Sequence, residues 1–483
     1  MHASIIFKVL GILLMVFSIT LIPPIAIAAY YQDGDTMVFV STFFWLLVVG
    51  LFLWYPLRKD KHDLKIRDGF VIVVMFWTVL GFVGAIPMYF AEATEISITD
   101  AIFESFSGLT TTGATIFSHL DNLPHGLLWY RQQLQWLGGM GIIVLAVAIL
   151  PMLGIGGMQL YKAESPGPVK DSKLAPRISE TAKALWYIYL GLTLACALAY
   201  KMAGMNWFDA FSHSFSTVAI GGFSTHDASI GYFNNSNIEM VAMFFMFFAG
   251  INFALHFTAF RKVDISPYRF DPEVRAYATI LLAGGLITSL YLYSHEIYLD
   301  MSDALRYGFF QTLSFGTTTG FANTDFSVWP AFIPVMLIMM SFIGGSAGST
   351  AGGMKVIRVI LLFKQGAREI KSLLHPNALM PVKLNGKVIP EKVMTAVWGF
   401  FSLYIVLFVF ILLLLMALGV DQVTAFSAVA AMINNLGPGL GEVSANYATL
   451  SDPVKWVLTF TMLLGRLELF TLLVLFTRAF WKI

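Results

Sequence analysis

Residues 100–113 read DAIFESFSGLTTTG, and three later stretches share their pattern. These are DAFSHSFSTVAIGG at 209–222, YGFFQTLSFGTTTG at 307–320 and TAFSAVAAMINNLG at 424–437. Each stretch begins with a helix-compatible run that carries aromatic residues, and each ends in a glycine thirteen positions after its first residue. The segments are too short and too polar to cross a bilayer, which takes about 20 apolar residues. Each is therefore expected to form a short helix that ends in a glycine turn.

The same spacing extends to the segments on either side of these stretches. Their end glycines, at 113, 222, 320 and 437, lie 109, 98 and 117 residues apart. A second glycine follows each of them by 24 to 28 residues, inside the next apolar run; these are Gly138, Gly250, Gly344 and Gly465. The chain thus consists of four copies of a unit of about 110 residues, built as span, short helix, glycine turn and span.

The composition indicates a membrane protein that crosses the bilayer many times. The 483 residues are 57% hydrophobic and 12% charged, with a mean hydropathy of +0.74. Soluble domains carry about 25% charged residues, so soluble folds are excluded. A net charge of +1 argues against nucleic acid as a partner, and a single cysteine, Cys196, allows no disulfide framework.

Hydropathy predicts ten spans. They lie near 9–30, 36–56, 69–91, 127–153, 184–203, 237–260, 276–294, 328–353, 394–418 and 453–480. The first run could also be a secretory signal, but it is longer than the 7 to 15 residues of a signal core, which favours a retained helix. The expected class is an all-α membrane protein with two N-terminal helices and four repeats around a pseudo-fourfold ion pore.

The lysine and arginine residues predict the orientation of the chain. Basic clusters at 58–68, 162–183, 261–275 and 355–392 alternate with acidic loops. Because cations near span ends stay cytoplasmic, both termini are expected in the cytoplasm. The loops 162–183 and 355–392 would also suit an acidic partner surface, although topology alone accounts for their charge.

The four glycine turns predict a cation pore. Non-helical backbone at membrane depth is tolerated only where protein buries it or where it lines a water-filled cavity. Four short helices would point their negative C-terminal ends at a common centre, and the turns would present carbonyl oxygens that replace the hydration shell of an alkali ion. The oxygens belong to residues just before each glycine. The expected filter set is Thr111, Thr112, Gly113, Ile220, Gly221, Gly222, Thr318, Thr319, Gly320, Asn435, Leu436 and Gly437.

Side chains near the turns have plainer interpretations. The threonine hydroxyl groups of the filter are expected to hold the turns rather than to bind the ion. Asp100 and Asp209 could concentrate cations at the outer mouth, or could cap their short helices. His213 and His226 are expected to be structural or outer-mouth residues, because no paired acid lies at metal-ligand spacing.

Long strings of the sequence carry a family resemblance. ESFSGLTTTGAT, HSFSTVAIGGFSTHDASIGYF, RQQLQWLGGMGIIVLAVAILP and GRLELFTLLVLF are examples. With the two extra N-terminal helices, the chain resembles the superfamily of potassium transporters that includes TrkH, TrkG and KtrB, over essentially its whole length. The resemblance implies low- or moderate-affinity uptake of potassium across a bacterial inner membrane. It also implies a homodimer and a cytoplasmic TrkA-type nucleotide-binding ring that controls the gate. No cofactor is expected, and potassium is the transported and bound ion.

The resemblance also assigns a gate. Residues 342–353, FIGGSAGSTAGG, interrupt the span after the third filter, and the family places an intramembrane gating loop there. Its expected residues are Gly344, Gly345, Ser346, Ala347 and Gly348. Arg466 lies within the last span, where a charge indicates a functional site, and the family places it at the pore beside that loop.

The expected units are then a pair of helices and four repeats. They cover 1–68, 69–183, 184–275, 276–392 and 393–483. Only repeats one and three read TTTG, so sodium exclusion is expected to be modest and rubidium should pass. Two alternatives stay open: sodium-coupled symport of the KtrB kind, and a secondary transporter with broken helices. The scattered histidines and the lack of catalytic motifs argue against an enzyme.

Overall fold

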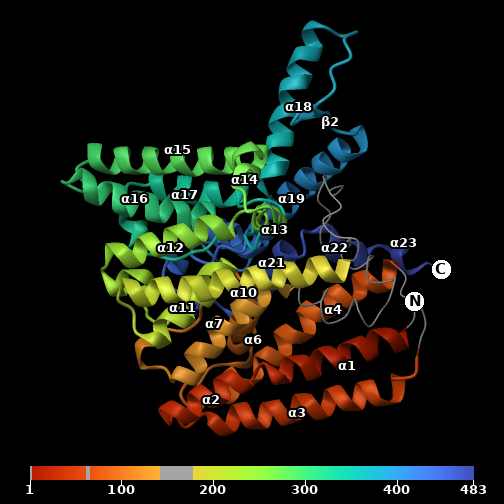
Figure 1. Cartoon of the computed structure of the whole chain (residues 1–483), viewed down its shortest axis with the longest axis vertical. Helices are drawn as coiled ribbons and strands as arrows, with labels where there is room; N and C mark the ends of the chain where they lie inside the picture. The colour runs from red at the N-terminus through yellow and green to blue at the C-terminus, as the bar shows by residue number, and fades with distance from the viewer. Residues whose placement is uncertain (1–2, 61–65, 142–177, 483) are drawn as a thin grey trace.

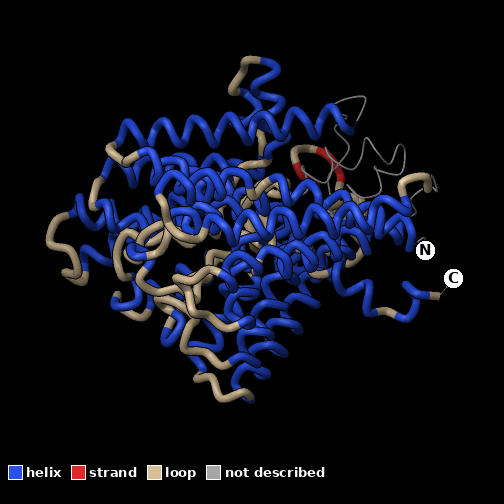
Figure 2. Tube along the Cα trace, turned by 90° about the horizontal axis from the view of Figure 1, so that it is seen from below, coloured by secondary structure: helices blue, strands red, loops and turns tan. Residues whose placement is uncertain are grey.

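The structure, a computed structural model, describes residues 3–60, 66–141 and 178–482, and these are mostly helical (Figures 1 and 2). Within these ranges the only strands are β1 (Lys383–Leu384) and β2 (Lys387–Val388), which form a small antiparallel hairpin. The all-α class expected from the sequence is confirmed.

Two antiparallel helical runs form the N-terminal part of the molecule, drawn in red in Figure 1. α1 (Ala3–Ile19) continues into α2 (Ile22–Tyr31), and α3 (Thr36–Trp54) returns beside α1. The two runs touch through small residues, since a Cβ atom on Gly11 would lie 2.7 Å from the carbonyl oxygen of Gly50. Small residues let the helices approach closely, which matters in a membrane because the hydrophobic effect does not drive helices together in apolar lipid.

The remaining helices follow the order of the predicted repeat. The first unit contains α4 (Ile66–Gly84), α5 (Ile86–Phe90), α6 (Ile98–Leu109) and α7 (His125–Gly139). The second contains α10 (Ile178–Ala203), α11 (Trp207–Ala219), α12 (Ser236–Ala249), α13 (Phe253–Lys262) and α14 (Ser266–Phe270). The third contains α15 (Pro272–Ser294), α16 (Met301–Gly316), α17 (Phe332–Ile343) and α18 (Val356–Leu374). The fourth contains α19 (Glu391–Ala417), α20 (Gln422–Ile433), α21 (Asp452–Arg466), α22 (Phe470–Leu473) and α23 (Arg478–Trp481). Short 3-10 turns are η1 (Tyr55–Leu57), η2 (Leu120–Asn122), η4 (Ser229–Phe233), η5 (Phe326–Val328), η6 (Gly441–Val443) and η7 (Val474–Phe476). The boundaries of the repeats are still predictions.

The described part of the chain crosses a membrane several times. Six helical runs are long and apolar enough: Ala3–Tyr31, Thr36–Leu57, Arg67–Phe90, Lys183–Ala203, Pro272–Ser294 and Glu391–Ala417. Two further helix pairs are apolar enough together but are bent, by 95° between α12 and α13 and by 108° between α21 and the segment Phe470–Phe476. The protein is therefore a multi-pass membrane protein.

Three of the four short helices, α6, α11 and α20, start at a side-chain cap. The side chains of Ser97, Asn206 and Asp421 accept hydrogen bonds from the backbone N–H three residues on, at 3.1, 2.7 and 2.9 Å. Such caps satisfy N–H groups that a helix leaves unpaired. Asp100 and Asp209 are thus not the caps, which corrects one of their two sequence interpretations. Asp100 instead contacts Lys455 Nζ at 2.6 Å.

The span that follows each short helix ends at or beside the second glycine, and two predicted spans are therefore wrong as continuous helices. These are the runs near 237–260 and 453–480, which form the two bent pairs; the run near 328–353 stops being helical at Ile343, where the sequence predicts the interruption at 342–353. Close packing surrounds these glycines. A Cβ atom on Gly250 would collide with the hydroxyl of Tyr277, and one on Gly138 or Gly465 would lie 1.8 Å from Leu109 O or 2.3 Å from Ile433 O, at the ends of short helices α6 and α20. The predicted span near 127–153 runs into residues outside the described ranges.

The first and last described helices, α1 and α23, lie with the chain ends on the same side of the bundle (Figures 1 and 2). On the same half of the molecule, α18 projects away from the other helices (Figure 1).

Substituting Gly138 by alanine should destabilise the fold. The new methyl group cannot fit beside Leu109 O, and overpacking of this kind costs about 1–3 kcal/mol. Thermal unfolding of the detergent-purified protein measures the effect. Gly191→Ala is the matched control, since a Cβ atom there meets nothing within 4 Å. Equal melting temperatures for the two variants would contradict the close packing.

Candidate ion pore

All four short helices end in the same hydrogen-bonded turn. In each, the N–H of the residue before the filter glycine donates to the carbonyl five residues earlier. The bonds run from Thr112 to Ser107 (2.9 Å), Gly221 to Ser216, Thr319 to Ser314 and Leu436 to Ala431 (2.8 Å each). This closure is typical of a Schellman motif, which satisfies carbonyls at a helix end. The repeat seen in the sequence is therefore also a repeat in hydrogen bonding.

The backbone of each turn alternates in the sign of φ. The residue two before each glycine is left-handed, with φ of 53° at Thr111, 54° at Ile220, 67° at Thr318 and 53° at Asn435. The filter glycines have φ of 80°, 80°, 82° and 96°. A left-handed non-glycine residue costs about 1–2 kcal/mol, so the surrounding structure holds each turn.

The four turns close into a ring. A Cβ atom on any filter glycine would lie almost on a carbonyl oxygen of the next repeat. The contacts are Gly113 with Gly221 O (2.1 Å), Gly222 with Thr319 O (2.0 Å), Gly320 with Leu436 O (2.1 Å) and Gly437 with Thr112 O (2.6 Å). The order of contact is first, second, third, fourth and first again. The structure therefore brings all twelve predicted filter residues together around one axis, at the C-terminal ends of four helices.

Such a ring has the chemistry of a site for an alkali cation. The ends of the short helices carry partial negative charge, and backbone carbonyls can replace the hydration shell of a monovalent ion. The ring is not fourfold identical, because its side chains differ from repeat to repeat. Among the described residues, no group of three or more His, Cys, Asp and Glu could hold a metal ion. Ion binding by the ring itself stays a prediction.

A glutamine behind the ring was not identified from the sequence. Gln135, on α7, is fully buried; its Nε2 donates to Gly221 O at 2.5 Å, and its Oε1 accepts from Phe223 N at 3.0 Å. It thus clamps the second filter turn from repeat one. The available signal was the polar string RQQLQ at 131–135 inside an otherwise apolar region.

A buried ion pair was also missed. Arg131, on α7, and Glu104, on α6, are both fully buried and lie 2.7 Å apart. Glu104 also accepts from Ile116 N at 2.8 Å, and Arg131 donates to Ser224 O at 3.2 Å. The pair therefore joins the segments that follow the first and second filters. Removing one partner of such a pair leaves an uncompensated buried charge.

The predicted gating loop leaves α17 at Gly344, which has a φ of 68°. The loop reaches the neighbouring units: Ser346 N donates to Gly250 O at 2.9 Å, and Gly348 O accepts from Phe253 N at 3.0 Å. Glu273, on α15, was not predicted; its Oε1 accepts from Ala347 N at 2.8 Å and from Ile357 N at 3.1 Å. Gly345 also packs here, since its Cβ atom would lie 2.9 Å from Gly250 O.

Arg466 lies beside this loop, as the resemblance implied. It is the last residue of α21, where the chain bends, rather than a residue within a continuous span. Its guanidinium donates to Gly138 O at 2.6 Å and to Thr350 O at 3.2 Å, and it lies over the ring of Trp77. Its charge is thus placed between the gating loop and repeat one. Glu468 pairs with Arg358 at 2.5 Å.

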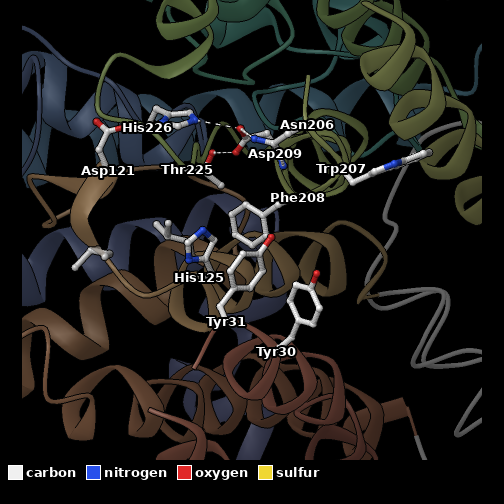
Figure 3. A pocket seen from close by; sticks show the side chains of 12 residues that line it. Tyr30, Tyr31, Asp121, His125, Asn206, Trp207, Phe208, Asp209, Thr225 and His226 are labelled. Atoms are coloured by element: carbon white, nitrogen blue, oxygen red, sulfur yellow. Dashed lines mark hydrogen bonds and ion pairs between the residues drawn. The ribbon is translucent and has the colours of Figure 1, made fainter. Parts of the chain in front are cut away.

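A cavity of about 540 Å³ opens beyond the second filter turn, between α2, α7 and α11 (Figure 3). Figure 3 shows Asp121, His226 and Asp209 along one edge and Phe208, His125 and Tyr31 along the other. His226 bridges Asp121 and Asp209 Oδ2, the latter at 3.3 Å, and stacks on Tyr232. Partial burial opposes protonation, but the hydrogen bonds and charges of Asp209 and Asp121 prevail and raise the pKa of His226. The imidazole joins repeats one and two at the mouth.

Comparison with known proteins gives a match over most of the chain. Residues 35–483 match the family model TrkH, described as a cation transport protein. The chain is 57% identical over 479 residues to the Trk system potassium uptake protein TrkH of Vibrio parahaemolyticus, covering 99% of each. It is 54% identical over 482 residues to the protein of that name from Escherichia coli strain K12, covering 100% of each.

A solved structure is similar over the full length of both chains. The crystal structure of the potassium transporter TrkH from Vibrio parahaemolyticus matches with a TM-score of 0.91 and 54% sequence identity, covering 100% of each chain. The likeness therefore extends over the residues of all four glycine turns and of the loop after α17.

Replacing Gln135 by leucine should lower the selectivity of the pore. The change leaves Gly221 O and Phe223 N without their side-chain partner, and an unmade buried hydrogen bond costs about 1–3 kcal/mol. The ratio of potassium to sodium flux into proteoliposomes measures it. Gln133→Leu is the matched control: this neighbour is also buried, but it bonds Thr20 O, away from the filter. Equal selectivity in both variants would contradict the role of Gln135.

Raising the pH should weaken the link that His226 makes between Asp121 and Asp209. Because the folded-state pKa of His226 is raised, its stabilising contribution is complete below the ordinary value of about 6.5 and is lost as pH rises through the raised pKa. Melting temperatures measured from pH 6 upward should therefore fall more steeply for the unmodified protein than for His226→Gln. If the melting temperatures of the two proteins fall in parallel with pH, the bridge at His226 contributes nothing to stability.

Proposed function

The chain belongs to the TrkH family of cation transport proteins, and on that premise we propose that it takes up potassium through a gated, channel-like pore. The closed ring of four filter turns is the observation that carries the proposal. Rubidium, which is close to potassium in size, should use the same path. The membrane is proposed to be the bacterial inner membrane, with both termini in the cytoplasm, which accords with α1 and α23 lying on one side.

The proposed filter is the set of backbone oxygens at Thr111, Thr112, Ile220, Gly221, Thr318, Thr319, Asn435 and Leu436, with the four glycines that follow them. The four turns carry different side chains, and only Gly221 O accepts a hydrogen bond from Gln135 Nε2. The ring is therefore less regular than one built from four identical loops. Modest exclusion of sodium is the expected result. Selectivity depends on the number and field strength of the coordinating oxygens.

A channel-like path is favoured over the two alternatives. The four short helices all run toward one ring, whereas secondary transporters usually have inverted repeats with a site between broken helices. Sodium-coupled symport of the KtrB kind is not favoured, because the full-length relatives at 54–57% identity are Trk system uptake proteins named TrkH.

The gate is proposed to be the loop 344–348 together with Arg466. The loop lies between neighbouring units, and the guanidinium beside it would oppose a cation that lodges there. Loop movement away from the filter would then open the path.

Regulation is proposed to involve a second copy of the chain and a cytoplasmic TrkA-type nucleotide-binding ring. The word "system" in the relatives' names supports partner subunits. The projecting helix α18 offers a surface, since Phe363 and Leu373 are 77% and 82% exposed beside Lys364 and Lys371. Residues 162–177 of the other predicted docking loop, 162–183, lie outside the described residues, and the rest begins α10.

Gly113→Ser should weaken the preference for potassium. A side chain on Gly113 would collide with Gly221 O, and its φ of 80° disfavours any side chain. The test is rubidium uptake into potassium-loaded liposomes, with external potassium or sodium as competitor. In the unmodified chain, potassium should compete several-fold better than sodium, and the substitution should narrow this gap.

Gly419→Ser is the matched control for backbone strain. Gly419 has a similar φ of 95°, but a Cβ atom there meets nothing within 4 Å. It should keep the potassium preference. The proposed pore is contradicted if external potassium does not reduce the rubidium uptake, or if Gly113→Ser does not change the preference for potassium.

A further inference from the structure

The gating loop is hydrogen-bonded to the filter turns themselves. Thr350 Oγ1 donates to Val218 O at 3.0 Å, at the end of the second short helix. Gly353 N donates to Asn434 O at 3.2 Å, in the fourth filter turn. Gly352 N donates to the hydroxyl of Thr318 at 2.7 Å, in the third. The loop therefore meets three of the four repeats directly at the edge of the ring.

The contact at Thr318 differs in kind from the other two. The bonds to repeats two and four end on backbone carbonyls, which any residue would supply. The bond from Gly352 ends on a side-chain oxygen, so it exists only while residue 318 carries a hydroxyl group. Thr318 is fully buried, and water cannot easily replace it as the acceptor.

The equivalent residues of the other repeats do not serve this purpose. Position 220 is isoleucine, which has no hydroxyl. Asn435 directs its amide to Thr112 Oγ1 at 3.0 Å and to Met462 O at 2.9 Å. Thr111 has the same side chain as Thr318, but within the described ranges the loop makes no hydrogen bond to it. Repeat one is reached instead through Arg466, which joins Thr350 O to Gly138 O.

Packing presses the loop onto the filter at this point. A Cβ atom on Gly352 would lie 1.9 Å from Asn434 O and 3.2 Å from Thr318 Oγ1. No side chain fits between the loop and the ring. The loop backbone and the third and fourth filter turns thus form one packed layer, in which the bond to Thr318 is the only one of the three that ends on a filter side chain.

We propose that Thr318 is a positioning residue for the gate: its hydroxyl tethers the gating loop, through Gly352 N, in the closed position beneath the filter. This rests on the proposed function, since it assumes that the loop is the gate. The same residue then serves the filter with its backbone and the gate with its side chain. Moving the loop away breaks this bond, so opening the gate changes a contact of the filter.

The test compares Thr318→Val with Thr318→Ser and Thr111→Val. Valine has the shape of threonine without the hydroxyl, whereas serine keeps the hydroxyl. Thr111→Val removes the hydroxyl from the matching position of repeat one, so it measures what such a loss does to the filter alone. The readout is rubidium flux through the purified full-length chain in liposomes without any partner.

Thr318→Val should raise this partner-free flux about fivefold over Thr111→Val, the factor that one ordinary hydrogen bond puts on an equilibrium. Thr318→Ser should restore the flux of the unmodified chain. The proposal is overturned if Thr318→Val and Thr111→Val give equal rubidium flux, or if Thr318→Ser does not return the flux to that of the unmodified chain. If Thr318 only stabilised the fold, Thr318→Val would lower the rubidium flux instead of raising it.

A second variant decides the matter if Thr318→Val does not fold. Gly352→Ala should also push the loop off the filter and raise partner-free flux, because its methyl group collides with Asn434 O. Gly366→Ala, on α18, is the control, since a Cβ atom there meets nothing within 4 Å. Unchanged flux in Gly352→Ala overturns the tether. Failure of the proposed function would give a different result: external potassium would not reduce the rubidium flux, and Gly113→Ser would not change it.

Discussion

The architecture depends on one contact made four times, between a filter glycine and a carbonyl oxygen of the next repeat. At 2.0 to 2.6 Å from a notional Cβ atom, these contacts leave space for hydrogen only. They fix how near the four turns come to the axis, and so the width of the ring. The short helices, their caps and the broken second helices all serve to bring four non-helical turns to this distance inside a membrane, where unpaired backbone is costly.

Holding the ring requires support that is not symmetric. Four left-handed residues, three of them β-branched, are strained in the same way in every repeat. The supports differ: Gln135 clamps the second turn, the Asn435 amide ties the fourth turn to the first, and the gating loop bonds the third. A backbone of near-fourfold symmetry is thus maintained by unlike side chains.

The sequence predicted the ring because its signal is local. The thirteen-residue spacing to each glycine and the recurring unit identified all twelve filter positions, and the structure brings them together. The bends at Gly250 and Arg466 were not predicted, because hydropathy is continuous across them and the glycines there pack against residues distant in the chain, Tyr277 and Ile433. The roles of Gln135 and Glu273 and the Glu104–Arg131 pair depend on contacts between residues far apart in the chain, for which one sequence has no periodicity to show.

The contact between Gly437 and Thr112 O has a consequence for how the protein is made. It joins the last filter turn to the first, so the ring stays open until the fourth repeat has been synthesised and inserted. A nascent chain with three repeats in the bilayer would hold exposed carbonyls and strained turns, with no neighbour on one side. A chain truncated before this repeat would therefore lack one wall of the ring and could not form a narrower version of it.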